Sequence, residues 1–147
     1  FQLLSQVAGR AGRGDRPGTV VVQTFNPRHP AVECARRHDP MAFYEETVLE
    51  RERAGYPPFR RLVNVLLSSE SRPAVEAASR EAADRLAGLD VLGPADCVLE
   101  RIADRWRRHL LVKLPDGADP APVARALLGW YPRDVQIVLD VDPYSLL

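Results

Sequence analysis

The sequence predicts an α+β fold in two parts: a helix-rich segment that ends a larger sheet, and a domain with its own antiparallel sheet. Three consecutive valines follow the first segment, and a regular alternation of strands and helices begins only after residue 60. Between the parts, the run Tyr56-Pro57-Pro58-Phe59 cannot continue a helix because proline lacks the backbone N–H. We therefore assign residues 1–45 to the first part, 46–60 to a helix and connector, and 61–147 to the second part.

The composition is that of a folded chain without a membrane span. Hydrophobic residues make up 46% and charged residues 27% of the 147 positions, which excludes a wholly disordered or fibrous chain. No apolar run approaches the roughly 18 residues of a membrane helix. The N-terminal residues also lack the basic start of a signal peptide, so we expect a cytoplasmic protein.

The cysteine and charge content limit which metal, disulfide and nucleic-acid sites the chain can form. Cys34 and Cys97 lie far apart without a Cys or His at zinc-ligand spacing, so we predict two buried thiols and neither a metal site nor a disulfide. Twenty basic residues balance twenty acidic ones, so nucleic-acid affinity would require a local patch. All the basic residues except Lys113 are arginines, which favours bidentate contacts with phosphate and carboxylate groups.

The first part contains a strand and two helices after its opening segment. Residues 19–25 resemble a strand buried on both faces, which is typical of a parallel sheet. No comparable strand lies nearby in the sequence, so we expect this strand to be the last of a larger α/β sheet. A short helix begins near Pro30, and a second helix begins at the N-cap Asp39 and ends at Gly55.

The second part has the order β-α-β-β-α-β, which is the ferredoxin-like order with two helices on one face of an antiparallel sheet. Apolar periodicity predicts each element. The expected strands are residues 62–68, 98–102, 106–114 and 135–141, and the expected helices are 73–86 and 122–128.

The most distinctive motif is Q-x-x-G-R-x-G-R at residues 6–13. Arg10 and Arg13 are three positions apart and share one face of a helix or turn, while the glycines permit close packing against a neighbouring domain. Such arginines can neutralise charge on a triphosphate during phosphoryl transfer. A glycine-rich helix end with solvated arginines fits the same pattern.

A second group of cations lies on the predicted hairpin around residue 104. Alternation places Arg107, His109 and Lys113 on one face, where they could follow DNA phosphates, and Trp106 could stack on an unpaired base. An acidic peptide would also suit this surface. The alternative is a solvated strand face whose other side packs on the helices. The candidate DNA-binding residues are Arg101, Arg105, Trp106, Arg107, Arg108 and Lys113.

Several unusual strings occur in the order known from one family. They are Gln23-Thr24-Phe25-Asn26-Pro27-x-His29-Pro30, Phe43-Tyr44, Glu50-Arg51, Gly55-Tyr56-Pro57-Pro58-Phe59 with Leu62, Arg105-Trp106-Arg107 and Asp140-Val141-Asp142-Pro143. The motif at residues 6–13 is similar to motif VI of superfamily-2 helicases. Together these strings resemble the PriA family, the primosomal replication restart DNA helicases also called primosomal protein N-prime.

The resemblance implies the C-terminal part of a DNA-dependent ATPase that recognises abandoned forks, unwinds with 3′ to 5′ polarity and reloads the replicative helicase. Residues 1–45 would close the second RecA-like helicase lobe. Residues 61–147 would be the family's C-terminal domain, with branched or forked DNA, the acidic tail of the single-strand binding protein and other primosome proteins as partners. By position, Gln6, Gly9, Arg10 and Arg13 would contact the nucleotide. Arg10 and Arg13 would be the catalytic residues, with Arg13 as the arginine finger.

The chain lacks the other parts of an ATPase site. It contains neither a G-x-x-x-x-G-K-[ST] phosphate loop nor a D-E-x-H acidic pair, so we expect it not to hydrolyse ATP alone. ATP and Mg²⁺ would act in the full-length protein, as would zinc, whose ligands would lie upstream. The alternative function is a noncatalytic module that docks on DNA or on the single-strand binding protein, and a ferredoxin-like domain with an unrelated ligand is a third. We expect a monomer, with swapping possible in a fragment.

Overall fold

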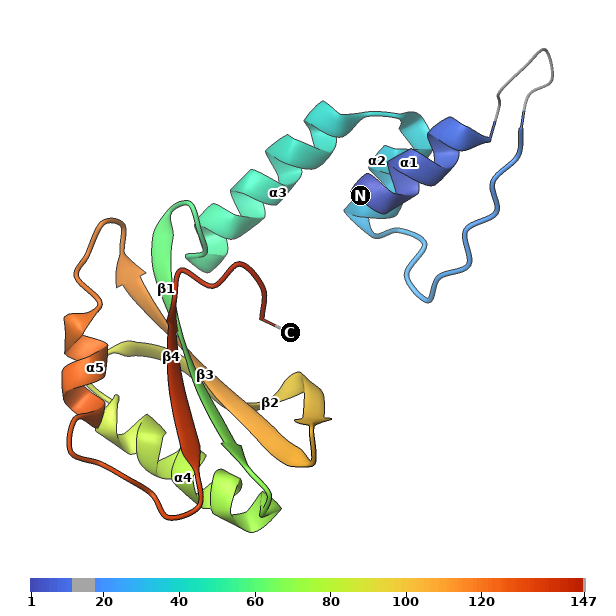
Figure 1. Cartoon of the computed structure of the whole chain (residues 1–147). Coiled ribbons are helices and arrows are strands. Elements are labelled where there is room, and N and C mark those ends of the chain that lie inside the picture. Colours follow the sequence, from blue (N-terminus) through green and yellow to red (C-terminus); the bar gives the residue numbers. More distant parts are fainter. Residues whose placement is uncertain (12–17, 147) are drawn as a thin grey trace. The chain divides into compact units, whose positions relative to one another are not determined.

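The computed structural model describes residues 1–11 and 18–146 and divides the chain into two compact units, Phe1–Arg53 and Ala54–Leu147 (Figure 1). The division falls near the end of the helix α3 (Pro40–Ala54). None of the helices in the described part of the chain is long and apolar enough to cross a membrane.

The first unit is built from helices, two of which begin with a side-chain cap. It contains α1 (Gln2–Arg10), α2 (Pro30–Arg37) and most of α3. His29 Nδ1 accepts a hydrogen bond from the Ala31 N–H at 3.1 Å, and Asp39 Oδ1 accepts one from the Ala42 N–H at 2.9 Å. Gly55 follows α3 with φ +63°. The Asp39 cap and this glycine confirm the predicted start and end of the helix.

The predicted strand over residues 19–25 is wrong for this chain. The segment has no regular secondary structure and appears in Figure 1 as a thread between α1 and α2. Val21 is 88% exposed and Phe25 is fully exposed, so the apolar side chains that predicted burial face solvent. The physical reason is that a strand requires a hydrogen-bonded neighbour, and the described part of this unit contains no other strand.

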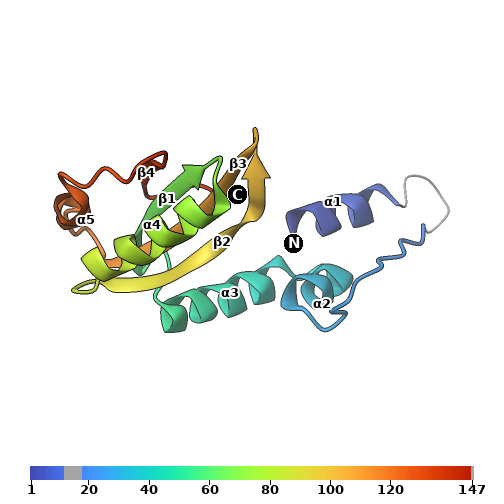
Figure 2. The ribbon, with the colours of Figure 1, turned by 90° about the horizontal axis from the view of Figure 1, so that it is seen from below.

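The second unit has the predicted β-α-β-β-α-β order. Its four-stranded sheet has the strand order β2-β3-β1-β4, with every neighbouring pair antiparallel. Figure 2 shows α4 running along the sheet. The elements are β1 (Arg60–Ser69), α4 (Arg72–Arg85), β2 (Asp90–Ile102), β3 (Arg105–Pro115), α5 (Ala121–Leu127) and β4 (Gln136–Val141).

One core lies between the sheet and its two helices. Alternate residues of β1 and β3 face the helices, as the period of two predicts. Val65, Leu67 and Leu110 are completely buried there. The cluster comprises Val63, Val65, Leu67, Val75, Ala78, Ala82, Leu86, Leu110, Val112, Leu114, Val123, Leu127 and Trp130.

β2 is longer than the sequence predicted, because it begins at Asp90 rather than at Val98. Its register against β3 shifts between Leu92 and Ala95 and again between Asp96 and Arg101. Gly93, with φ +107°, precedes Pro94 inside the first shift. The glycine and proline interrupt the alternation of apolar residues, which explains why the pattern did not reveal this half of the strand.

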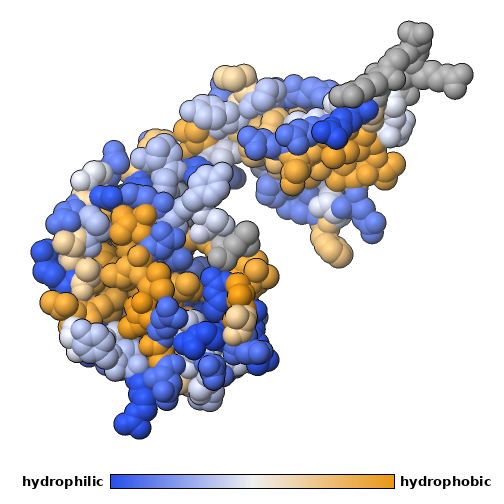
Figure 3. Space-filling model, in the orientation of Figure 1, coloured by the Kyte–Doolittle hydropathy of each residue, from blue (hydrophilic) through white to orange (hydrophobic). Residues whose placement is uncertain are grey.

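An apolar surface remains between α5 and β4. In the orientation of Figure 1, Figure 3 shows an apolar area over these two elements. A groove of about 350 Å³ runs between them, and it includes Leu128, Tyr131 and Leu139. Leu128 is 77% and Tyr131 86% exposed, so this surface is separate from the buried core.

Candidate nucleic-acid interface

The β2–β3 hairpin carries the candidate DNA-binding residues. Ala103 and Asp104 form its two-residue turn with φ values of +48° and +60°, the conformation that suits a tight hairpin. On its other edge β3 pairs with β1, where Arg107 is opposite Ser68, His109 is opposite Leu66 and Lys113 is opposite Leu62. These three β3 residues therefore share the face turned away from the helices, as the alternation predicts. We call Arg101, Arg105, Trp106, Arg107, Arg108 and Lys113 the cationic hairpin.

Trp106 is partly buried against the core, and guanidinium groups cover its ring. Arg72 of α4 lies 4.8 Å and Arg101 of β2 5.3 Å from the ring centroid. A base could stack on Trp106 only by displacing one of these cations. Sequence reasoning missed Arg72, because nothing in the linear pattern indicates that the first turn of α4 meets the hairpin.

Arg101 and Arg72 also pair with carboxylates close to them in sequence. Arg101 lies 3.2 Å from the Asp104 carboxylate, which is 90% exposed. The Arg72 Nε donates to Glu76 at 3.0 Å, and this hydrogen bond raises the pKa of Arg72 although burial opposes the shift. Because the Arg101–Asp104 pair is exposed, it is weak and a phosphate can replace the carboxylate.

Arg108 is more buried than Arg101 and Arg105, and it points toward the helix side of the sheet. Its Nε lies 3.1 Å from an Asp96 oxygen, and its Nη2 donates to the Pro94 carbonyl at 3.3 Å. Only 17% of its side chain is exposed. Arg108 therefore holds the irregular part of β2 against β3.

Arg107 and His109 occupy the face opposite to Arg108. Arg107 donates to the Leu99 carbonyl at 3.5 Å. Burial, with a smaller contribution from the Arg107 charge, lowers the pKa of His109 and favours its neutral form. Its buried Nδ1 has no hydrogen-bond partner within the described residues.

Lys113 lies at the other end of β3. Its ammonium donates to the Ala54 carbonyl and lies 4.7 Å from the centroid of the Tyr56 ring. The only lysine of the chain therefore fastens the proline-rich connector to the sheet.

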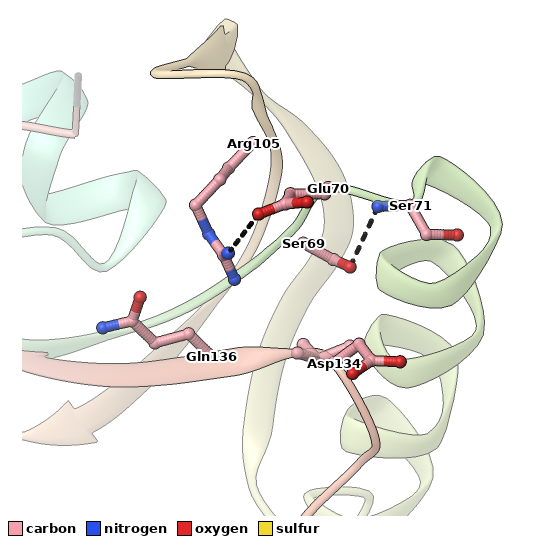
Figure 4. Close-up of a pocket in the computed structure, with 7 residues that line it drawn as sticks. Ser69, Glu70, Ser71, Arg105, Asp134 and Gln136 are labelled. Atoms are coloured by element: carbon pink, nitrogen blue, oxygen red, sulfur yellow. Dashed lines mark hydrogen bonds and ion pairs between the residues drawn. The ribbon is translucent and has the colours of Figure 1, made fainter.

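Arg105 lines a pocket of about 500 Å³ at the end of the sheet where β1 leads into α4. The Arg105 Nη2 donates to the Ser68 carbonyl at 2.9 Å, and Nε donates to Ser68 Oγ at 3.3 Å. Figure 4 shows its guanidinium directed into the pocket, with Glu70 on one side and Gln136 on another. We call this space the Arg105 pocket; it is lined by Ser69, Glu70, Ser71, Arg105, Asp134, Val135 and Gln136.

Charges of both signs surround the Arg105 pocket. Glu70 lies 3.8 Å from Arg105 and is 83% exposed. Asp134, with φ +60°, precedes β4 on the opposite side. Ser69 Oγ accepts a hydrogen bond from the Ser71 N–H at 3.1 Å. The sequence did not indicate this pocket, because its residues come from three separate stretches of the chain.

The candidate nucleotide-contacting residues lie on α1 in the first unit. Gln6 and Arg10 are one helical turn apart, and both are exposed, as is Gly9. No atom lies within 4 Å of the position that a Cβ at Gly9 would take. Arg13, the candidate arginine finger, lies outside the described residues.

The two cysteines are buried, as the sequence predicts. Cys34 and Cys97 are buried and unbridged, and burial raises the pKa of the Cys97 thiol. Within residues 1–11 and 18–146, no group of three His, Cys, Asp or Glu side chains could hold a metal ion.

The chain is similar to one family of known proteins. Residues 52–144 match the model of the primosomal protein N C-terminal domain. The whole chain is 40% identical to the replication restart protein PriA of Treponema pallidum and 31% identical to that of Bacillus subtilis. It covers 23% and 20% of those two proteins, so it spans about a fifth of the length of these relatives. The protein of the same name from Synechocystis is 35% identical over 99% of the chain, which covers 18% of that relative.

Proposed function

Because the chain belongs to the family of the primosomal protein N C-terminal domain, we propose that it is the C-terminal part of a replication restart protein and binds forked or branched DNA through the cationic hairpin. The observation that carries this proposal is the exposure of the carboxylates that pair with Arg101 and Arg105. Asp104 and Glu70 are 90% and 83% exposed, so DNA phosphates can replace them at little cost.

The members of the cationic hairpin have different roles in this proposal. Arg101, Arg105 and Arg107 are the phosphate-binding residues, since their partners are exposed carboxylates or backbone carbonyls. Arg108 and Lys113 support the strands by binding Asp96 and the Ala54 carbonyl. Trp106 orients Arg101 and Arg72 through its ring.

In the full-length protein, the first unit would contribute to an ATP site shared with upstream domains. Gln6, Gly9 and Arg10 would contact the nucleotide, and Arg13 would neutralise charge on the transferred phosphate. ATP and Mg²⁺ would then drive 3′ to 5′ unwinding and reloading of the replicative helicase, while zinc ligands would lie elsewhere in the longer protein. Arg13→Ala in the full-length protein should lower ATP turnover by about 10³-fold or more.

The second candidate function is docking of the acidic tail of the single-strand binding protein without helicase activity. The same exposed arginines would bind its carboxylates. A competition experiment between fork DNA and an acidic peptide distinguishes the two functions. If the hairpin is a DNA site, fork DNA in excess displaces an acidic peptide, whereas the peptide displaces fork DNA poorly.

The test of DNA binding is fluorescence anisotropy with fork DNA and the double variant Arg105→Ala, Arg107→Ala. We expect a several-fold loss of affinity and a decrease of about 2 in the slope of log affinity against log salt. The matched control is Arg125→Ala, Arg133→Ala, which removes the same charge from two exposed positions on and after α5.

Two results would contradict this assignment. One is unchanged fork binding by the hairpin variant while its thermal unfolding matches that of the parent chain. The other is an equal loss in the control variant, because this would indicate attraction by net charge and not by a located site.

A further inference from the structure

The Arg105 pocket has the size of a site for one small molecule. Its volume of about 500 Å³ exceeds what one phosphate group fills and lies within the roughly 300–1,000 Å³ of ligand sites. The pocket is polar on both sides, since Arg105 faces Asp134 and Gln136 across it (Figure 4).

The Arg105 side of the pocket suits an anion. A guanidinium has about five N–H donors, and the contacts to Ser68 and Glu70 engage three of its nitrogen atoms. The Glu70 contact, at 3.8 Å, is too long for a hydrogen bond. The guanidinium therefore keeps N–H groups that can donate hydrogen bonds to a phosphate.

The Asp134 side can accept hydrogen bonds from a ligand, because this exposed carboxylate is free to contact one. The Asp134 carboxylate makes no hydrogen bond or ion pair with the described residues, and it offers two acceptor oxygens and no donor. Gln136, on the same side, presents an amide that can donate or accept. A ligand that combines a negative group with a donor-bearing edge would engage both sides of the pocket.

A guanine nucleotide unit has this combination. The Watson–Crick edge of guanine carries adjacent N1–H and N2–H donors, which match the two oxygens of a carboxylate. Thymine offers one N–H between two carbonyl oxygens, which repel a carboxylate. In single-stranded DNA this edge is open, and proteins recognise such bases by hydrogen bonds to it.

We propose that the Arg105 pocket binds one unpaired guanine nucleotide of the fork, with a phosphate on Arg105 and the base edge on Asp134. The proposal rests on the proposed function, since it assigns a specificity to the same DNA-binding surface. A guanine site would give the hairpin a sequence preference among single-stranded arms. Phosphate contacts alone cannot supply such a preference.

The test compares the affinity of the chain for two forks. In one, the single-stranded arms alternate thymine and guanine; in the other, hypoxanthine replaces every guanine of the arms. This replacement removes only the 2-amino group. With the 147-residue chain, we expect the guanine arm to bind roughly fivefold more tightly. In Asp134→Asn we expect the two arms to bind equally. Asparagine tolerates the positive φ of residue 134, so the backbone should be preserved.

Two further variants separate the sides of the pocket. Glu70→Gln removes the carboxylate near Arg105 and should raise the affinity for both arms without changing their ratio. Asp116→Asn makes the same chemical change as Asp134→Asn in the exposed loop after β3 and should leave the guanine preference intact.

The proposal is overturned if the parent chain binds both arms equally, or if Asp134→Asn keeps the preference while its unfolding transition is unchanged. Fork binding that still depends on Arg105 and Arg107 would then leave the proposed function standing. Loss of fork binding with every arm, or displacement of fork DNA by an acidic peptide, would overturn the proposed function itself.

Discussion

Exposure of the acidic partner decides which arginine of the cationic hairpin can bind a ligand. Arg105 and Arg108 are three positions apart and both lie near a carboxylate. Glu70 near Arg105 is 83% exposed, whereas Asp96 is 43% exposed and the Arg108 side chain only 17%. Exchange of Glu70 for a phosphate therefore costs little, while removal of Asp96 would leave a partly buried charge without its partner.

His109 makes the stability of the second unit depend on pH. Burial lowers its pKa below the value in the unfolded chain, so the unfolded state binds the proton more readily. The contribution of neutral His109 is therefore fully present above about pH 6.5 and is lost as the pH falls toward the lowered pKa. Urea unfolding at pH 7.5, 6.5 and 5.5 should show this loss of stability in the parent chain.

The variant His109→Asn isolates this effect, because asparagine does not titrate and can place a polar atom near the position of Nδ1. We expect a shallower decrease in unfolding free energy between pH 7.5 and 5.5 than in the parent chain. Parallel pH profiles for the two proteins would show that other groups, such as the carboxylates paired with arginines, cause the decrease.

The residues of the site were predictable only in part. The cations of the hairpin are close together in sequence, so their clustering could be predicted. The carboxylates that pair with these cations could not be predicted, because Glu70 and Asp96 lie outside residues 101–113, the stretch that carries the cations. Asp134 and Gln136 complete the Arg105 pocket only after β4 pairs with β1, and no local pattern indicates that.

At the scale of elements, the irregularity in β2 depends on Gly93. Its φ of +107° is in a region that L side chains rarely adopt, and a Cβ there would lie 2.9 Å from the His109 carbonyl oxygen. Gly93→Ala should therefore lower the unfolding free energy by about 1–3 kcal/mol. Chemical denaturation monitored by circular dichroism measures this change.

Gly88→Ala is the matched control. No atom lies within 4 Å of a Cβ at this position. We expect a change within about 0.5 kcal/mol. If both alanine variants were equally stable, the backbone of β2 would have to differ from the one described here.

Local patterns predicted elements that find their partners within the second unit. β1, β3, α4, α5 and β4 follow alternating or helical apolar spacing, and all of them occur near the predicted bounds. The prediction of a strand over residues 19–25 was wrong for the opposite reason. Its valines satisfy the pattern, but the described part of its unit supplies no strand to pair with. Hydrophobic periodicity predicts burial only where the burying surface is present.

At the scale of the whole molecule, the two units differ in how much core they contain. The second unit holds a continuous cluster from both helices and the sheet, including fully buried Val65, Leu67 and Leu110. In the described residues of the first unit, only Cys34 and Ala35 are buried, and Val21 and Phe25 are exposed. Stability should therefore be concentrated in residues 54–147.

This difference predicts that the fragment 54–147 folds alone. Its length is that of an ordinary domain, and all residues of the main core cluster belong to it. We expect one cooperative thermal transition with a midpoint close to the main transition of the 147-residue chain. The fragment 1–53 should show no cooperative transition, because two small buried side chains cannot offset the entropy of ordering its backbone.

Calorimetry on the three chains measures both expectations. A cooperative transition in the fragment 1–53 would show that its helices are stable without a larger core, and an unfolded fragment 54–147 would show that its sheet requires the first unit.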